Sequence, residues 1–356
     1  MPRARDLGIR IGLLPTGPTN SVLDVAGVGL GHATVHRDEP SVARTGVTCL
    51  LLADDAYLRP VPAGGAVLNG AGECTGFLTA QEWGAAETPV YLTSTMQLGR
   101  VYDAACEIEL EGHAEVAHDV VIPIVSECDD SHLNDCRRMQ VTHDDVRAAH
   151  AAALASRGVA SPPDEGAVGA GTGMSCLGFK GGIGTASRVT GEGHTVAVLL
   201  LTNFGTRDQL RVDGVPVGRL LPPAPPAPAE PAGSCVGLVV TDAPVDAASC
   251  QRLARRVGLG LARVGSVATH GSGEIFLAFG TGLRLDRDQL PDRAGLAGRA
   301  LDPLFAAVVE ATEEAVLNSM LGAPTTTGRD GNRSESLHSP EVLALLGRTR
   351  PDGVRS

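Results

Sequence analysis

The stretch LLPPAPPAPAEPAGSCVGLVVTDAP, residues 220–244, changes character at Gly233 and Ser234. The part before this point is rich in proline, which lacks a backbone donor and fixes φ, so it predicts a linker at 222–233 and not a helix or a central strand. The part after it is apolar and rich in β-branched residues, which predicts a buried strand. A loose linker is therefore joined by a glycine to a serine at the first position of a buried strand.

Short apolar runs on both sides of this junction predict further strands. They cover 22–35, 45–53, 89–95, 118–125, 194–202, 235–241 and 274–280. Helical spacing predicts helices at 97–112, at 143–158, from about 245 to 264, and from Asp302 to Gly322. In the last helix we expect Asp302 as the N-cap and Pro303 in the first turn. Strands and helices occur in both halves, so the fold class is α/β (α+β).

The residues after Ser234 hold only two clear strands and two helices. Such a set cannot bury both faces of its own sheet, because a stable domain needs packed layers around a shared core. We therefore expect one structural domain, built by 1–233 and 234–356 together.

Composition narrows the class of partner. The chain has 356 residues, is 43% hydrophobic, and carries a formal net charge of −12. Without any long Lys/Arg run, this charge argues against nucleic acid and against an anionic membrane surface. The start of the sequence shows no signal peptide and the chain no apolar span, which predicts a cytoplasmic protein that does not associate with membranes. Eight cysteines without a C-x-x-C pair predict buried free thiols.

A serine at the start of a strand can become a nucleophile if a base lies within reach. Cleavage of the bond between Gly233 and Ser234 would free an α-amine, whose ordinary pKa is about 7.7–8.0, to accept the proton of Oγ. Glycine suits the preceding position because it has no Cβ and leaves the scissile carbonyl open to attack. The dipeptide is common, however, so a linker that ends in a strand N-cap is the alternative interpretation.

The residues around this junction resemble a known family. Residues 233–282, GSCVGLVVTDAPVDAASCQRLARRVGLGLARVGSVATHGSGEIFLAFGTG, are similar to L-aminopeptidase/D-esterase-amidases and β-peptidyl aminopeptidases, which are self-cleaving hydrolases often grouped with N-terminal-nucleophile enzymes. Further blocks follow the family's order: RDLGIRIG, NSVLDVAGVGLGHATV, LNGAGECTGF, PIVSECDDSHLND, GFKGGIGTASR, LLTNFG and TTTGRDGNR. Together they span nearly the whole chain, which makes the joint pattern specific.

This resemblance implies a four-layer αββα sandwich and a set of catalytic residues. Ser234 matches the nucleophile, released by autoproteolysis at Gly233-Ser234 into chains 1–233 and 234–356. Ser272 and Glu274 match residues that assist it through hydrogen bonds and charge. Asn203 matches an oxyanion donor, for which the alternative is a simple turn cap after its strand. The resemblance also implies a homo-oligomer, a tetramer of processed units, and no metal or organic cofactor.

The segment SECDDSHLND, residues 126–135, offers acceptors for the ammonium group of a substrate. We expect Glu127 to bind it, with Asp130 and His132 as further substrate-binding candidates. Members of the family often carry an aromatic hydroxyl near this segment, whereas here His132 is the nearest polar ring. A metal site at these residues is disfavoured because no second histidine lies at a suitable spacing.

Two other patterns in the sequence suggest a catalytic triad and a nucleotide site. A triad of Asp242, His270 and Ser272 is the alternative catalytic set, but His270 and Ser272 lie only two residues apart on one loop. The glycine-rich segment 166–188 contains neither of the common phosphate-binding motifs, so it predicts close backbone packing and not a nucleotide site.

The sequence thus predicts a self-cleaving serine aminopeptidase, amidase or esterase. It would hydrolyse the bond after a free N-terminal amino acid of small peptides, amides or esters. Two alternatives remain: an acyltransferase of the ornithine-acetyltransferase kind, for which threonine is the expected nucleophile, and an unprocessed inactive relative with a binding role.

Overall fold

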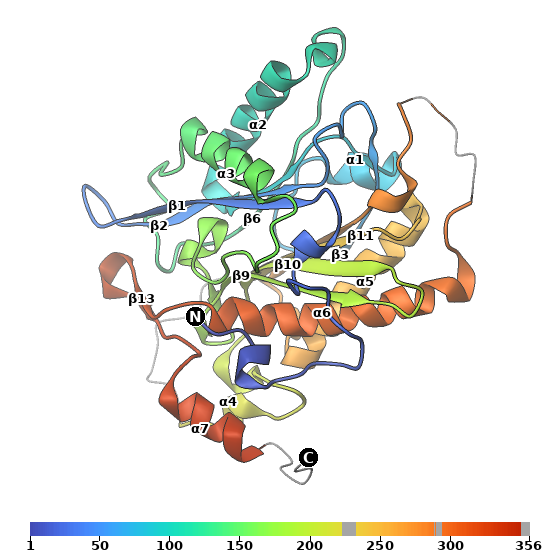
Figure 1. The fold of residues 1–356 in the computed structure, drawn as a ribbon. Helices are drawn as coiled ribbons and strands as arrows, with labels where there is room; N and C mark the ends of the chain where they lie inside the picture. The colour runs from blue at the N-terminus through green and yellow to red at the C-terminus, as the bar shows by residue number, and fades with distance from the viewer. Residues whose placement is uncertain (223–232, 288, 290–293, 350–356) are drawn as a thin grey trace.

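The computed structural model describes residues 1–222, 233–287, 289 and 294–349. Two β-sheets pack face to face, with helices on the outer side of each, so the layers follow the order α-β-β-α (Figure 1). The predicted αββα sandwich is confirmed. Residues 223–232 of the predicted linker lie outside the described residues.

The first sheet has four strands, in the order β1-β2-β5-β6. They are antiparallel except for the parallel pair β5 and β6. Helices α2 and α3 cover the outer face, where their alanines and valines pack against Val47, Cys49 and Tyr91. The bounds are β1 (Gly29–Arg37), β2 (Ala43–Leu51), β5 (Val90–Ser94), β6 (Ile124–Cys128), α2 (Leu98–Gly112) and α3 (His143–Ser156).

The second sheet has six strands, in the order β4-β3-β12-β11-β10-β9. Helices α5 and α6 cover its outer face. The parallel strands β11 and β12 pair with each other in the middle of this sheet, and each also pairs with a strand of the first half of the chain. The bounds are β4 (Ala85–Ala86), β3 (Val61–Gly70), β12 (Gly273–Gly280), β11 (Ser234–Thr241), β10 (Thr195–Asn203), β9 (Gly182–Val189), α5 (Ala247–Val264) and α6 (Asp302–Leu321).

The six-stranded sheet therefore contains strands of both 1–233 and 234–356. Between the sheets, Leu199, Leu238 and Leu277 of the central strands pack in one core with Leu50 and Leu92 of the first sheet. Because both faces of these strands are buried, their sequences are almost continuously apolar.

The remaining elements are short. They are the helices α1 (Phe77–Glu82), α4 (Val217–Leu220) and α7 (Pro340–Thr349), and the strands β7 (Ser175–Cys176), β8 (Phe179–Lys180), β13 (Thr326–Thr327) and β14 (Arg333–Ser334). Short 3-10 turns occur at Arg5–Leu7, Val22–Asp24, Thr95–Gln97, Ala114–His118, Gly169–Gly173, Arg207–Gln209, Thr281–Leu283, Gly298–Leu301 and Arg329–Gly331.

Three of the predicted element boundaries were wrong. The run 22–35 divides into a 3-10 turn and strand β1, and only the last two residues of the run 118–125 are strand, because β6 starts at Ile124. Asp302 lies inside α6 and does not cap it with its side chain, although Pro303 does occupy the first turn. Strands β3 and β9 were not predicted, because their Pro and Gly residues lowered the strand signal.

The state of the cysteines agrees with the sequence analysis. All eight cysteines are free; six are buried and two are half-buried. Within the described ranges, no helix is both long and apolar enough to cross a bilayer.

Candidate active site

The ends of several strands meet at one edge of the space between the sheets. Ser234 is the first residue of β11, and the antiparallel register pairs it with Asn203, the last residue of β10. On its other side, Ser234 pairs with Gly273 at the start of β12. The register of the sheet therefore places the predicted nucleophile beside the predicted oxyanion donor.

The Ser234 side chain is buried but makes no hydrogen bond. Ser234 is 5% exposed, and its Oγ has no hydrogen-bond partner among the described residues. The nearby Cys128 thiol is also buried, and burial raises its pKa well above the usual range. Buried hydroxyls nearly always have a partner, so the unpaired hydroxyl of Ser234 calls for an explanation.

The peptide bond before Ser234 is held by its surroundings. The carbonyl of Gly233 accepts a hydrogen bond from the backbone N–H of Gly273, with 3.2 Å between N and O. A Cβ at position 233 would lie 3.1 Å from both the carbonyl oxygen of Asn203 and Oγ of Ser272. A side chain would crowd this position, which explains the glycine at the predicted cleavage site.

Ser272 and Glu274 form a buried pair. Oγ of Ser272 donates a hydrogen bond to Oε1 of Glu274, and both residues are almost fully buried. Burial raises the pKa of Glu274, and the bond from Ser272 opposes this shift. Oε2 of Glu274 has no hydrogen-bond partner in the described part of the chain. A buried carboxylate oxygen in this state is suited to a cationic donor.

The amide of Asn203 is held in one orientation by two backbone groups. Its Oδ1 accepts a hydrogen bond from the N–H of Ser175 (2.9 Å), and its Nδ2 donates to the carbonyl of Asp129 (2.8 Å). These partners lie far from Asn203 in sequence, so the side chain does not cap a turn after its own strand. Nδ2 carries a second hydrogen, for which the described residues supply no acceptor.

The Glu127 carboxylate lies near the start of β12. Its Oε1 accepts from the N–H of Glu73 (2.8 Å), and its Oε2 accepts from the hydroxyl of Thr95. A Cβ placed on Gly72 would lie 3.2 Å from this Oε1 and 3.9 Å from Cα of Gly273. One glycine therefore separates the Glu127 carboxylate from the start of β12. Burial raises the pKa of Glu127, and the bonds from Thr95 and Glu73 oppose the shift.

Asp130 and His132 occupy different surroundings. The Asp130 carboxylate is fully buried, accepts from Ser94 (2.8 Å) and Asn134 (3.0 Å), and has its pKa raised to about 6 by burial. His132 is half-buried against the 326–334 segment, and its carbonyl accepts from Asn332. Neither makes a hydrogen bond with the residues around Ser234, and their role in substrate binding stays a prediction.

Some residues that support the site were missed in the sequence. Nδ2 of Asn69, near the end of β3, donates to the carbonyls of Thr269, His270 and Ser272 and so fixes the loop that carries Ser272. Asn69 and Glu73 both lie in the block LNGAGECTGF, which was noted only for its resemblance. Each of these hydrogen bonds joins a side chain to a backbone group. Such contacts require no particular residue spacing, so the sequence shows no pattern that would predict them.

The absence of an aromatic hydroxyl near 127–135 is also seen in space. The three tyrosines pack elsewhere: Tyr57 stacks on His113, Tyr91 bonds to His150, and Tyr102 lines a groove beside α2 and α3.

The alternative catalytic and metal sites are not assembled. Asp242 follows the far end of β11, an eight-residue strand that spans about 26 Å at about 3.3 Å per residue, and it accepts from the N–H of Thr195. The described residues contain one group of three possible metal ligands, Asp103, Glu107 and His143, but it lies on α2 and α3, and Glu107 already pairs with Arg147.

The glycine-rich segment packs backbone against backbone, as predicted. A Cβ at Gly171 would lie 2.5 Å from the carbonyl oxygen of Gly166 and from the nitrogen of Ile183, and a Cβ at Gly181 would lie 2.5 Å from the carbonyl oxygen of Thr202. The segment thus closes tightly beside β9 and β10.

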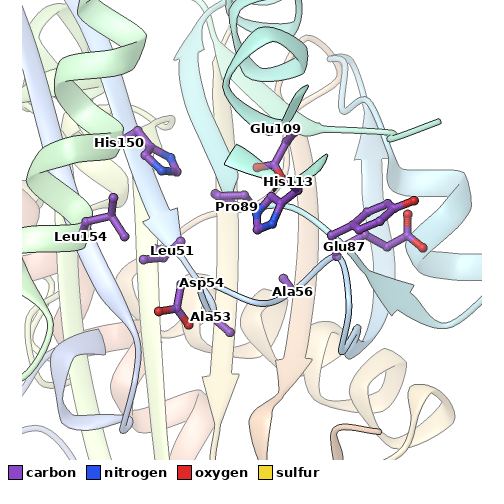
Figure 2. Close-up of a pocket in the computed structure, with 11 residues that line it drawn as sticks. Leu51, Ala53, Asp54, Ala56, Glu87, Pro89, Glu109, His113, His150 and Leu154 are labelled. Carbon is purple, nitrogen blue, oxygen red and sulfur yellow. Dashed lines mark ion pairs between the residues drawn. The ribbon is translucent and has the colours of Figure 1, made fainter. Parts of the chain in front are cut away.

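A pocket of about 170 Å³ lies elsewhere (Figure 2). Figure 2 shows Glu109, His113 and His150 around it, and Leu51 and Pro89 also line it. Pro89 precedes β5, whereas Thr95 at the opposite end of that strand contacts Glu127. None of the predicted catalytic residues lines this cavity.

Comparisons with known proteins agree with this geometry. The profile described as Peptidase family S58 matches residues 20–334. The chain belongs to peptidase family S58. It is 35% identical over 385 residues to beta-peptidyl aminopeptidase BapA of Sphingosinicella microcystinivorans, an alignment that covers 98% of this chain and 93% of that protein.

Solved structures of S58-like proteins have the same fold. The β-aminopeptidase of Burkholderia sp. is 39% identical, with a TM-score of 0.88 and full coverage of both chains. The L-aminopeptidase D-Ala-esterase/amidase of Ochrobactrum anthropi, described as a prototype for the serine aminopeptidases and as a variant of the Ntn hydrolase fold, is 33% identical with a TM-score of 0.87, and covers 98% of this chain and 100% of its own. This S58 chain is therefore a hydrolase, a serine aminopeptidase. None of these three relatives is an acyltransferase.

Proposed function

We propose that this chain cleaves itself between Gly233 and Ser234 and that Ser234 is the nucleophile of the mature enzyme. One observation carries the proposal: an unpaired, buried Ser234 hydroxyl lies directly after a peptide carbonyl that accepts from the N–H of Gly273, at a glycine where a Cβ would lie close to Ser272. Oγ adds to the carbonyl carbon of Gly233, the bond to the nitrogen of Ser234 breaks, and that nitrogen takes the hydroxyl proton. Water then hydrolyses the resulting ester and leaves Gly233 with a free carboxylate.

In the mature enzyme the new α-amine acts as the base. It takes the proton of Oγ as the hydroxyl attacks the carbonyl of the substrate's N-terminal residue, and it returns the proton to the leaving amine. The amide of Asn203 donates to the oxyanion, a contact of a kind that contributes about 2.7–4 kcal/mol. The unpaired Oε2 of Glu274 accepts from the protonated amine and so stabilises its charge. Water finally hydrolyses the acyl-enzyme.

Glu127 is the residue that we assign to the substrate's ammonium. Its carboxylate lies one glycine away from β12, whereas Oδ1 of Asp130 accepts from Ser94 and Asn134. The substrate is then a short peptide, amide or ester with a free amine. The names of the relatives favour β-amino acid residues at the N-terminus.

Intact-mass spectrometry with N-terminal sequencing tests the proposal. The wild-type protein should give two masses that sum to the full chain plus one water, with the shorter chain beginning Ser-Cys-Val-Gly. Ser234→Ala should give one intact, folded and inactive chain. Splitting at the same bond in Ser234→Ala would refute the mechanism.

The substrate class is tested on the processed enzyme with β-alanyl and L-alanyl p-nitroanilides. Their N-acetylated forms serve as matched controls, because they lack the ammonium that Glu127 would bind. Equal hydrolysis of free and acetylated forms would exclude an aminopeptidase site. The tetramer of processed units and the cytoplasmic location remain predictions, and native mass spectrometry tests the first.

A further inference from the structure

The sequence contains a single lysine, Lys180, and it is completely buried. All other strongly basic side chains are arginines. Lysine is rarely found inside a protein, since its ammonium loses hydration there, and burial lowers the pKa of Lys180 to about 7. The mechanism proposed above does not use this residue.

Three backbone carbonyls surround the Lys180 ammonium. Nζ donates to the carbonyl oxygens of Gly171 (3.0 Å), Met174 (2.7 Å) and Gly181 (2.8 Å). These bonds use all three hydrogens of an ammonium, so the geometry is that of the protonated form. A planar guanidinium would not direct its donors to three such points around one atom, which explains why this position carries lysine and not arginine.

One of these carbonyls belongs to the peptide group that orients Asn203. The carbonyl of the Met174–Ser175 peptide accepts from Lys180, and the N–H of the same peptide donates to Oδ1 of Asn203. The carbonyl of Met174 also accepts from the N–H of Gly181 (3.0 Å). A cation on the carbonyl polarises the peptide and strengthens its N–H as a donor.

The glycine-rich segment explains how the lysine reaches this place. The 3-10 turn Gly169–Gly173 leads directly to Met174, and the chain returns through β7 and β8 so that Lys180 lies beside the carbonyls of Gly171 and Met174. The glycine-rich segment 166–188, which contains no nucleotide-binding motif, thus supplies the backbone carbonyls that surround one ammonium.

We propose that Lys180 is a positioning residue that acts on the oxyanion through the Met174–Ser175 peptide and the Asn203 amide. The inference rests on the proposed function, because it assigns Asn203 to the oxyanion. Lys180 touches neither substrate nor nucleophile. With the peptide held, Oδ1 of Asn203 stays paired and the free hydrogen of Nδ2 stays available for the transition state.

A double-mutant cycle tests this proposal on processed enzyme. Asn203→Ala should lower kcat about 100- to 1,000-fold, and Lys180→Met at least about tenfold with little change in KM. The double variant should be no slower than Asn203→Ala alone, because Lys180 acts only through that amide. Turnover is counted per processed chain, as measured by intact mass.

Phe179→Leu is the matched control. Phe179 is buried beside Lys180 in β8 and packs under Arg207, without contact to Asn203. Its small effect on kcat should be the same factor with and without Asn203→Ala. If Lys180→Met behaves in this way too, its role is only structural and the inference is overturned. If Asn203→Ala leaves kcat unchanged, the proposed oxyanion role fails as well.

A second measurement covers the case in which Lys180→Met does not fold or process. In the uncleaved Ser234→Ala chain, lysine-selective ¹⁵N labelling gives one Nζ signal, because the sequence has one lysine. Asn203→Ala should shift this signal, whereas Ser272→Ala should leave it in place. A signal that does not respond to Asn203→Ala overturns the proposal.

Discussion

At the residue scale, the site is made of buried polar atoms whose partners are incomplete. Oγ of Ser234 and Oε2 of Glu274 lack partners in the described chain, while the groups around them are paired. The sequence identified Ser234, Ser272, Glu274 and Asn203 because they match family positions, and sheet register brings Ser234 and Asn203 together. It did not identify Lys180, whose bonds go only to backbone carbonyls.

The charge of Glu274 should set the pH at which the mature enzyme becomes active. A neutral α-amine is the required base, so kcat/KM rises as pH increases through the pKa of that amine, about 7.7–8.0 when unperturbed. An ionised Glu274 favours the protonated amine and raises this pKa. Glu274→Gln should therefore move the rising limb to lower pH, on the order of one unit, while the maximal rate falls.

Ser272→Ala is the control for this prediction, since it removes a hydroxyl and keeps the charge. The kcat/KM of Ser272→Ala should fall, while the pH of its rising limb should move much less than in Glu274→Gln. The measurement is kcat/KM against pH for the wild type and both variants, after intact-mass confirmation of processing. A limb at the same pH in wild type and Glu274→Gln would show that the carboxylate does not act on the amine.

At the element scale, apolar runs predicted the central strands well and the outer ones poorly. Strands β10, β11 and β12 are buried on both faces, and their sequences are therefore almost continuously apolar. Strands β3 and β9 contain glycines that permit helices to approach: a Cβ at Gly64 would lie 2.5 Å from the nitrogen of Gln251 in α5, and one at Gly184 would meet the backbone of Ala315 in α6. Their glycines are contact points between layers.

The contact between β9 and α6 also depends on a buried arginine. Arg188 is fully buried; it donates to Glu310 (3.2 Å) and Glu314 (2.7 Å) of α6 and to the carbonyl of Ile11 (2.8 Å). Arg188→Met would leave both carboxylates without this cation, which should lower the free energy of unfolding by about 3–5 kcal/mol. Glu314 keeps its bonds to Arg5 and Asn20, so we expect the lower end.

Urea unfolding of the uncleaved Ser234→Ala chain measures this effect on a single polypeptide. Arg137→Met is the control: Arg137 is largely exposed and pairs with Asp135, so its loss should cost within about 1 kcal/mol. Equal stabilities of the two variants would mean that the buried pairs contribute no more than a surface pair.

At the scale of the whole molecule, the proposed cleavage divides the chain without dividing the fold. Strands β11 and β12 of 234–356 lie between β10 and β3 of 1–233, and α5 and α6 cover strands of both parts. Separation would expose both edges of this strand pair and the apolar core on its two faces. The processed chains should therefore elute together in size-exclusion chromatography, at the volume of uncleaved Ser234→Ala, and separate only in denaturant. Elution of the shorter chain on its own would contradict the arrangement, because a free 234–356 chain would have to leave the middle of a six-stranded sheet.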